Sequence, residues 1–253
     1  NQGRNQEALE RLEEAHGIYK EVHGPNHEAV ASVLLALCGV YPSLGQLDKA
    51  LETCQEALRI FRLTKGDGSE DVALALLNIG STFSDQGRLA EAREHTEEAL
   101  GIFRRLHGEK HPNVAKALDS IGMILNEQGE YDEALKLYRK ALKIRRHVYG
   151  EDHKAVATTL CNIGIALCDQ GKQDEAVEVY EEALGVYTRA LGVDNKDNAG
   201  VHWSIAQAKC ETGDVAGALE SARECVRIYD KLGITNTISQ RAGDMLMGLE
   251  GIE

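Results

Sequence analysis

Glycine recurs every 42 residues along the chain, and this period constrains the fold more than any other feature. Each of these glycines is followed five residues later by an alanine, from Gly3 and Ala8 to Gly213 and Ala218. A fixed period without insertion or deletion indicates one supersecondary unit stacked on copies of itself. We therefore expect one elongated array of repeats, whatever domain count the length alone suggests.

Each period contains two segments with the apolar spacing of α-helices. In residues 113–128 and again in residues 131–148, apolar side chains recur at intervals of three and four. Gly129 suits the turn after the first segment and Gly150 the end of the second, because glycine adopts a positive φ without steric cost. Small residues recur inside the first segment, which indicates that helices approach closely there; they are Gly80, Gly122, Gly164 and Ala206.

These paired segments resemble the tetratricopeptide repeat. The resemblance rests on Ile121-Gly122 and its copies, on the turn glycine and on the alanine of Glu133-Ala134. The period of 42 residues and the segment Gly150-Glu151-Asp152-His153 are similar to the long repeats of kinesin light chain and nephrocystin. The resemblance implies an all-α fold, a right-handed superhelical solenoid of antiparallel helix pairs. Its expected parts within one array over residues 1–253 are a leading half-repeat at 1–26, repeats at 27–68, 69–110, 111–152, 153–194 and 195–236, and a trailing degenerate helix at 237–253.

Some residues have expected local roles. His27, His111 and His153 each precede a first helix, with Ser69 and Asn195 at the same place in the other repeats, so we expect capping or loop packing and no metal site. Pro42 lies in the last turn of a first helix and should bend or shorten it.

The six cysteines follow no Cys-x-x-Cys spacing and fall mainly within the apolar pattern of the helices. We expect small buried residues with reduced thiols, in a cytoplasmic protein. Cys168 and Cys210 occupy the same position in adjacent repeats, so a redox pair is the alternative there.

Charge and motifs exclude several classes of function. A net charge of −13 disfavours nucleic acid and anionic membranes as partners, and no segment is long and apolar enough to span a bilayer. The sequence contains no phosphate-binding loop, zinc-protease helix, nucleophile elbow or dinucleotide fingerprint. We expect no enzyme activity, no cofactor and no metal. Because the chain begins at Asn1, inside a repeat, we expect it to be a piece of a longer protein.

The resemblance implies that first helices line a concave groove in which such arrays bind extended segments. The groove positions predicted for this chain are Leu35, Leu74, Leu77, Asn78, Asp85, Lys116, Asp119, Met123, Asn126, Glu127, Asn162, Ile165, Asp169, Trp203 and Gln207. The groove is acidic and lacks the basic residues with which chaperone adaptors and kinesin light chain hold acidic ligands. The predicted ligand is therefore a protein or peptide segment with basic and apolar side chains. The three leucines would receive the apolar groups, and the amides of Asn78 and Asn162 would hold the main chain.

Acids recur in the last turn of four first helices, where the helix dipole disfavours negative charge; they are Asp85, Glu127, Asp169 and Glu211. Either they serve the N-terminus of the following helix, which we favour, or they form a ladder for Lys or Arg of a ligand. The helix at 131–148 is instead rich in basic residues. It is either a solvated basic face or a docking patch for an acidic partner.

The predicted function is a non-enzymatic scaffold or adaptor that binds proteins. One alternative is the sensor or autoinhibitory arm of a multidomain signalling ATPase, or a motor adaptor like kinesin light chain. Another is a structural array that self-associates through exposed half-repeats at its ends.

Overall fold

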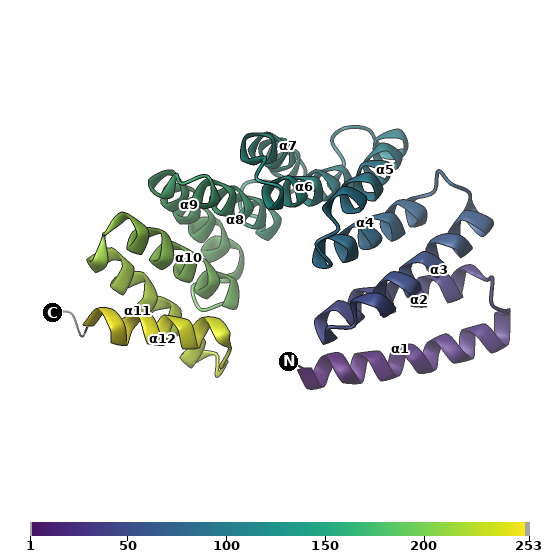
Figure 1. Ribbon diagram of the computed structural model, residues 1–253, viewed down its shortest axis with the longest axis horizontal. Helices are drawn as coiled ribbons and strands as arrows, with labels where there is room; N and C mark the ends of the chain where they lie inside the picture. The colour runs from purple at the N-terminus through teal and green to yellow at the C-terminus, as the bar shows by residue number, and fades with distance from the viewer. Residues whose placement is uncertain (1, 251–253) are drawn as a thin grey trace. The chain divides into compact units, whose positions relative to one another are not determined.

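The computed structural model describes residues 2–250 and, among them, contains α-helices and one 3-10 turn but no β-strand (Figure 1). The predicted all-α class is confirmed. The chain divides into two compact units. The first, Asn1–Gln128, contains α1 (Gln2–His23), α2 (Glu28–Val40), η1 (Tyr41–Leu44), α3 (Leu47–Lys65), α4 (Glu70–Asp85), α5 (Leu89–His107) and α6 (Pro112–Glu127). The second, Gly129–Glu253, contains α7 (Tyr131–Tyr149), α8 (Lys154–Asp169), α9 (Gln173–Leu191), α10 (Lys196–Thr212), α11 (Val215–Lys231) and α12 (Thr237–Glu250).

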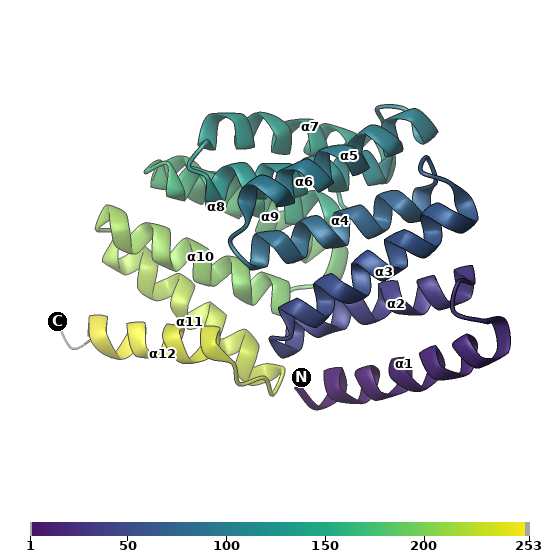
Figure 2. The ribbon, with the colours of Figure 1, turned by 45° about the vertical axis from the view of Figure 1, so that its right-hand side comes forward.

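Within each unit, helices that follow one another in the sequence pack side by side (Figures 1 and 2). In the first unit α2 packs on α3 and α4 on α5, and in the second α8 packs on α9 and α10 on α11. In the first unit α3 also packs on α4 and α5 on α6, and in the second α7 packs on α8 and α9 on α10, so the inner helices of each unit are covered from two sides. Phe61 of α3 and Phe103 of α5 are fully buried in this way. The core of each unit therefore runs along the stack of pairs.

Side chains cap most of the first helices as expected. The Nδ1 atoms of His27, His111 and His153 accept hydrogen bonds from backbone N–H groups two residues on, at 3.1–3.2 Å. At α10, Asn195 Oδ1 accepts hydrogen bonds from the backbone N–H groups of Asp197 and Asn198. Ser69 at α4 makes no such bond. Glycine supplies the positive φ at both kinds of turn, with 79° at Gly129 and 81° at Gly150.

Pro42 shortens its helix, as predicted. α2 ends at Val40, and the chain continues as the 3-10 turn η1, with the proline near its start. Proline lacks the N–H that an α-helix would use at this point, so the backbone closes the shorter 3-10 bonds instead. Gly45, at φ 73°, then begins the turn into α3.

A disulfide joins Cys38 of α2 to Cys54 of α3, with the two Cα atoms 5.5 Å apart. The expectation of six reduced thiols is therefore wrong for these two. One repeat later, 42 residues further on, Gly80 occupies the position of Cys38 and Thr96 that of Cys54. At this pair of positions the first and second helices of a repeat lie close together. This approach brings the two sulfur atoms together. Cys168 and Cys210 remain unpaired, as do Cys161 and Cys225.

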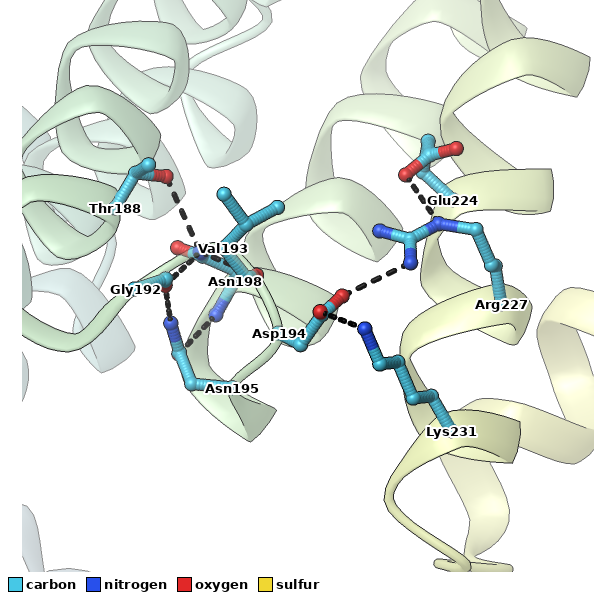
Figure 3. Close-up of polar contacts among 9 residues, drawn as sticks. All are labelled: Thr188, Gly192, Val193, Asp194, Asn195, Asn198, Glu224, Arg227 and Lys231. Atoms are coloured by element: carbon cyan, nitrogen blue, oxygen red, sulfur yellow. Dashed lines mark hydrogen bonds and ion pairs between the residues drawn. The ribbon is translucent and has the colours of Figure 1, made fainter.

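A buried amide and a carboxylate hold the turn between α9 and α10 (Figure 3). Asn198 is 1% exposed, and its Nδ2 donates to the carbonyl oxygens of Gly192 and Val193 at 3.0 and 2.9 Å. Asp194 accepts hydrogen bonds from Lys231 and, at 2.9 Å, from Arg227, both on α11. These bonds, from Lys231 first and then Arg227, lower the pKa of Asp194. The loop is thereby fastened to the following helix.

Candidate functional site

Each unit contains a surface cavity between two first helices. The α4–α6 cavity has a volume of about 80 Å³ and is lined by Gly80, Ser81, Ser84, Asp85, Thr96, Ser120, Met123, Ile124 and Glu127. The α8–α10 cavity has a volume of about 350 Å³ and is lined by Ile165, Cys168, Asp169, Tyr180, Ser204, Gln207, Ala208 and Glu211.

The two cavities are equivalent positions of the repeat. Apart from Gly80, every residue that lines the α4–α6 cavity has its counterpart 84 residues later in the α8–α10 cavity. Asp85 corresponds to Asp169 and Glu127 to Glu211, so both carboxylates occur in both cavities. Most of the other lining residues differ. The packing of helix pairs therefore forms a cavity at this position of the repeat. The negative charge of the two carboxylates is the chemical property that both cavities share.

The second helix supplies the floor of each cavity by reaching past a glycine of the first helix. A Cβ atom at Gly80 would meet Thr96 Oγ1 and lie 3.0 Å from the carbonyl oxygen of Ala92. A Cβ atom at Gly164 would lie 2.7 Å from Cδ1 of the Tyr180 ring. The predicted close approach at Gly80 and Gly164 is confirmed, and it is what lets Thr96 and Tyr180 reach the cavities.

The carboxylates of the α4–α6 cavity have different surroundings. Glu127 Oε2 accepts a hydrogen bond at 3.0 Å from the hydroxyl of Ser84, which links α6 to α4. Asp85 has no hydrogen-bond or ion-pair partner among residues 2–250, and burial raises its pKa. A cationic group placed in this cavity would stabilise the Asp85 carboxylate without displacing an existing partner.

The α8–α10 cavity combines neutral polar groups with its two acids. Burial is the main cause that raises the pKa of both the Tyr180 phenol and the Cys168 thiol. Glu211 Oε2 accepts a hydrogen bond at 2.6 Å from Gln173 of α9. The phenol and thiol thus stay neutral, and the charge of this cavity comes from carboxylates.

The favoured expectation, that the recurring acids serve the N-terminus of the following helix, is wrong for Glu127 and Glu211. α5, α7 and α9 have no side-chain hydrogen bond at their N-caps, and α11 is capped by Asp214. Backbone hydrogen bonds close these turns, as from Arg88 N to Phe83 O at 2.8 Å. Glu127 and Glu211 bond instead to side chains of the preceding pair.

Six of the predicted groove residues line the cavities; they are Asp85, Met123 and Glu127 in the first unit and Ile165, Asp169 and Gln207 in the second. Leu77 and Asp119 are only 4% and 6% exposed. They belong to the core and offer little to a ligand at the surface. Trp203 packs against the core cluster formed by α10, α11 and α12.

The remaining predicted residues lie outside both cavities. Lys116 is exposed, and the others are half-buried: Leu35, Leu74, Asn78, Asn126 and Asn162. The side chains of Asn78 and Asn162 make no hydrogen bond within residues 2–250, so both amides are available.

Sequence reasoning missed the floor residues Thr96 and Tyr180, because it considered first helices alone. A signal for them exists. Each lies sixteen residues after the small residue that it faces, and the same offset separates Cys38 from Cys54. Reading positions sixteen apart as partners across a pair would have found both the floors and the disulfide.

No three His, Cys, Asp or Glu side chains gather into a metal-binding group in the part of the chain whose side chains are described. Across the same residues, every helix is too short or too polar to cross a membrane.

The helix pairs and their recurring cavities define a helical-repeat protein. A comparison with family profiles identifies the repeat, since Tetratricopeptide repeat profiles match residues 1–63, 31–102, 71–147, 114–189 and 161–232. The chain belongs to the tetratricopeptide repeat family.

Several solved structures have a similar fold. BtubC (BKLC) from P. vanneervenii matches with a TM-score of 0.75 and 20% identity, over 92% of this chain and 93% of that one. A candidate kinesin light chain from Podosopora anserina, built of nearly identical TPR-like repeats, matches with a TM-score of 0.67 and 18% identity over 83% and 99%. A Rap protein complexed with Competence and Sporulation Factor matches with a TM-score of 0.68 and 11% identity over 96% and 74%. At these identities the likeness is one of fold. No curated protein sequence matches the chain.

Proposed function

We propose that the chain is a non-enzymatic scaffold in which each of the two units binds a segment of a partner protein along its own first helices. The observation that carries this proposal is the recurrence of one acidic cavity at the same register of both units. Each cavity would receive a basic side chain of the segment, and Met123 or Ile165 at its rim would contact the apolar part of that side chain.

The size of the α4–α6 cavity supports a side chain as its occupant. The α4–α6 cavity, at about 80 Å³, is far smaller than the roughly 300–1,000 Å³ of small-molecule sites. It suits the end of one long side chain. The α8–α10 cavity is larger, at about 350 Å³. A whole Lys or Arg side chain would fit there beside Asp169 and Glu211.

The amides of Asn78 and Asn162 complete the proposed surface. Each carries donors and an acceptor that have no partner in residues 2–250, so each would pair with the main chain of an extended segment. Such contacts hold a backbone whatever its sequence, while the cavities would select basic side chains.

The test uses a fluorescein-labelled (Lys-Leu)4 peptide and measures binding by anisotropy. Asp85→Asn combined with Asp169→Asn removes one acid from each cavity. Asp174→Asn combined with Asp230→Asn, on the exposed faces of α9 and α11, is the control with the same change in charge. We expect the first variant to bind at least about tenfold more weakly, since a charge-assisted contact contributes roughly 1.5–3 kcal/mol and about 1.4 kcal/mol corresponds to a tenfold change in affinity. The control should bind as the wild type does.

Equal binding by both variants and the wild type would refute the acidic cavities as the site. A pull-down with the Asn78→Ala, Asn162→Ala variant tests the amides separately. Partner lists identical to those of the wild type would exclude them.

Self-association is a second candidate function, favoured by the exposed face of α1. Ile18 and Tyr19 are 53% and 40% exposed, whereas their counterparts Ile60 and Phe61 are fully buried. No helix within residues 2–250 covers this face of α1. Light scattering over a range of concentrations tests this function, and a mass that stays monomeric throughout rules it out.

A further inference from the structure

Four basic side chains form a stripe along the exposed face of α7. They are Lys136, Arg139, Lys140 and Lys143, and we call them the α7 ridge. At 3.6 residues per turn these positions fall within about a third of the helix circumference. The opposite face of α7 is buried through Ala134, Tyr138 and Ala141, so the ridge points away from the core.

The other two arginines of α7 are used by the fold. Arg145 Nη1 donates to the carbonyl oxygen of Ala155 at 3.1 Å and to the Thr159 hydroxyl. Arg146 forms ion pairs with Glu151, at 2.7 Å, and with Glu182 of α9. These contacts tie α7 to the next pair, and they account for two of the six basic residues in the helix.

The ridge residues are left mostly without partners. Lys136 pairs with Glu133 one turn away, at 2.6 Å. Arg139, Lys140 and Lys143 have no hydrogen-bond or ion-pair partner within residues 2–250. The helix dipole favours cations near the C-terminal end of a helix. This effect accounts for Arg145 and Arg146. It does not account for a stripe that begins at Lys136, in the first half of α7.

The repeat provides an internal comparison that isolates this charge. The positions of Lys136, Arg139 and Lys140 carry glutamate in the second helices on either side in the sequence: Glu94, Glu97 and Glu98 in α5, and Glu178, Glu181 and Glu182 in α9. All three helices have the same length, 19 residues. The helix therefore forms with either sign at these positions, so the reversal in α7 is not a requirement of the fold.

We propose that the α7 ridge is a docking surface for a short acidic segment of a partner protein. Charge complementarity is the argument for this occupant, since four cations stand on a chain of net charge −13. Lys136 and Lys143 are about 10 Å apart along the axis. That length matches about three residues of an extended segment, or two turns of a helix, with three or four carboxylates.

The surroundings of the ridge favour a short segment over a larger polyanion. Asp132 and Glu133 lie in the first turn of α7, and Glu178 and Glu181 are exposed on the neighbouring helix α9. An anionic membrane or a long nucleic acid covering the ridge would also meet these acids, and the repulsion would offset the attraction. A segment that follows the stripe avoids them.

The experiment uses a fluorescein-labelled hexaglutamate peptide, with anisotropy measured at low and high salt. Lys136→Glu, Arg139→Glu and Lys140→Glu together form the ridge variant, which has the glutamates that α5 and α9 carry. Arg105→Glu, Lys110→Glu and Lys172→Glu together form the control, with the same change in charge at exposed positions outside the ridge. A third protein with glutamine at the three ridge positions removes the attraction without adding repulsion, and circular dichroism verifies that all fold.

We expect the peptide to bind the wild type, to bind the ridge variant at least about tenfold more weakly because three ion pairs are lost, and to bind the control within about twofold of the wild type. The glutamine protein should fall between. Salt should weaken binding to the wild type because it screens exposed charges.

Equal losses in the ridge variant and the control would show that only net charge matters and would overturn the proposal. Ridge-dependent binding of phosphatidylserine vesicles or single-stranded DNA that is tighter than binding of the peptide would also overturn it, in favour of a lipid or nucleic-acid surface.

Discussion

The disulfide between α2 and α3 allows a quantitative test of the first pair. Its Cα–Cα distance of 5.5 Å lies in the middle of the usual range, about 4.4–6.8 Å. Cys38 and Cys54 are 2% and 0% exposed. The bond closes a loop across a sequence separation of 16 residues, and the loss of chain entropy on closing such a loop corresponds to about 3 kcal/mol at 25 °C. Reduction should therefore destabilise α2 and α3 by about 3 kcal/mol.

The assay must be local, because repeat proteins unfold in stages and one global transition would mix several pairs. Native-state hydrogen exchange resolves individual helices. With dithiothreitol, amides of α2 and α3 should exchange about a hundredfold faster, the factor that corresponds to 3 kcal/mol. Amides of α9 and α11 should be unaffected. The Cys38→Ala, Cys54→Ala variant should exchange like the reduced protein and show no further change with dithiothreitol.

Two results would refute this reasoning. Alkylation of the denatured, unreduced protein should modify four of its six cysteines; modification of all six would show that no bond forms. Unchanged exchange of α2 and α3 upon reduction would show that packing alone holds the pair. Cys161→Ala is the matched control, since Cys161 is an unpaired and half-buried cysteine of a first helix.

Further substitutions test the fold at single positions. His111→Ala should lower the free energy of unfolding by about 1 kcal/mol through loss of the cap, and His111→Asn should restore it; thermal unfolding measures both. Gly164→Ala should lower the free energy of unfolding by about 1–3 kcal/mol, because the added methyl group would meet the buried ring of Tyr180. Gly200→Ala should raise it by up to about 1 kcal/mol, because nothing lies within 4 Å of the added methyl group. Urea unfolding should therefore show changes of opposite sign for the two variants. The pKa of Asp194 is lower in the folded protein than its ordinary value of 3.8. The ionised carboxylate therefore stabilises the fold fully when the pH is above 3.8. This stabilisation is lost as the pH falls through the lowered pKa of the folded protein. Urea unfolding of Asp194→Asn should thus show a deficit against the wild type at pH 7 that disappears in strong acid, and an equal deficit at both would contradict the assignment.

The helices follow closely from the sequence, because periodic apolar residues and turn glycines act on the backbone directly. Residues 113–128 and 131–148 were expected to be helical, and the structure has Pro112–Glu127 and Tyr131–Tyr149. Caps were predictable for the same reason, since a side chain two residues before an N–H can reach it in any such turn. Ser69 is the exception, because its hydroxyl makes no cap bond.

The candidate site was less predictable, because it depends on contacts between helices. Asp85 and Glu127 both line the α4–α6 cavity, but the sequence does not predict the side chains that surround them. Thr96 reaches the cavity only because Gly80 lies opposite, and a pattern along one helix carries no such information. The disulfide was missed for the same reason. The spacing of Cys38 and Cys54 in the chain does not indicate the bond, because their register across the helix pair is what brings them together.

Comparison between repeats separates what the stack requires from what it leaves open. Gly164 is required, because a side chain there would collide with Tyr180. Asp85 is different, since its carboxylate caps no helix and its pKa is raised by burial, so the fold gains nothing from its charge. Lys140 is also different, because glutamate at the same register in α5 and α9 accompanies helices of equal length. Charges that the stack neither needs nor neutralises are those that a partner can neutralise on binding. The acidic cavities and the basic ridge therefore predict partners of opposite charge, and binding at the two surfaces should respond independently to their own substitutions.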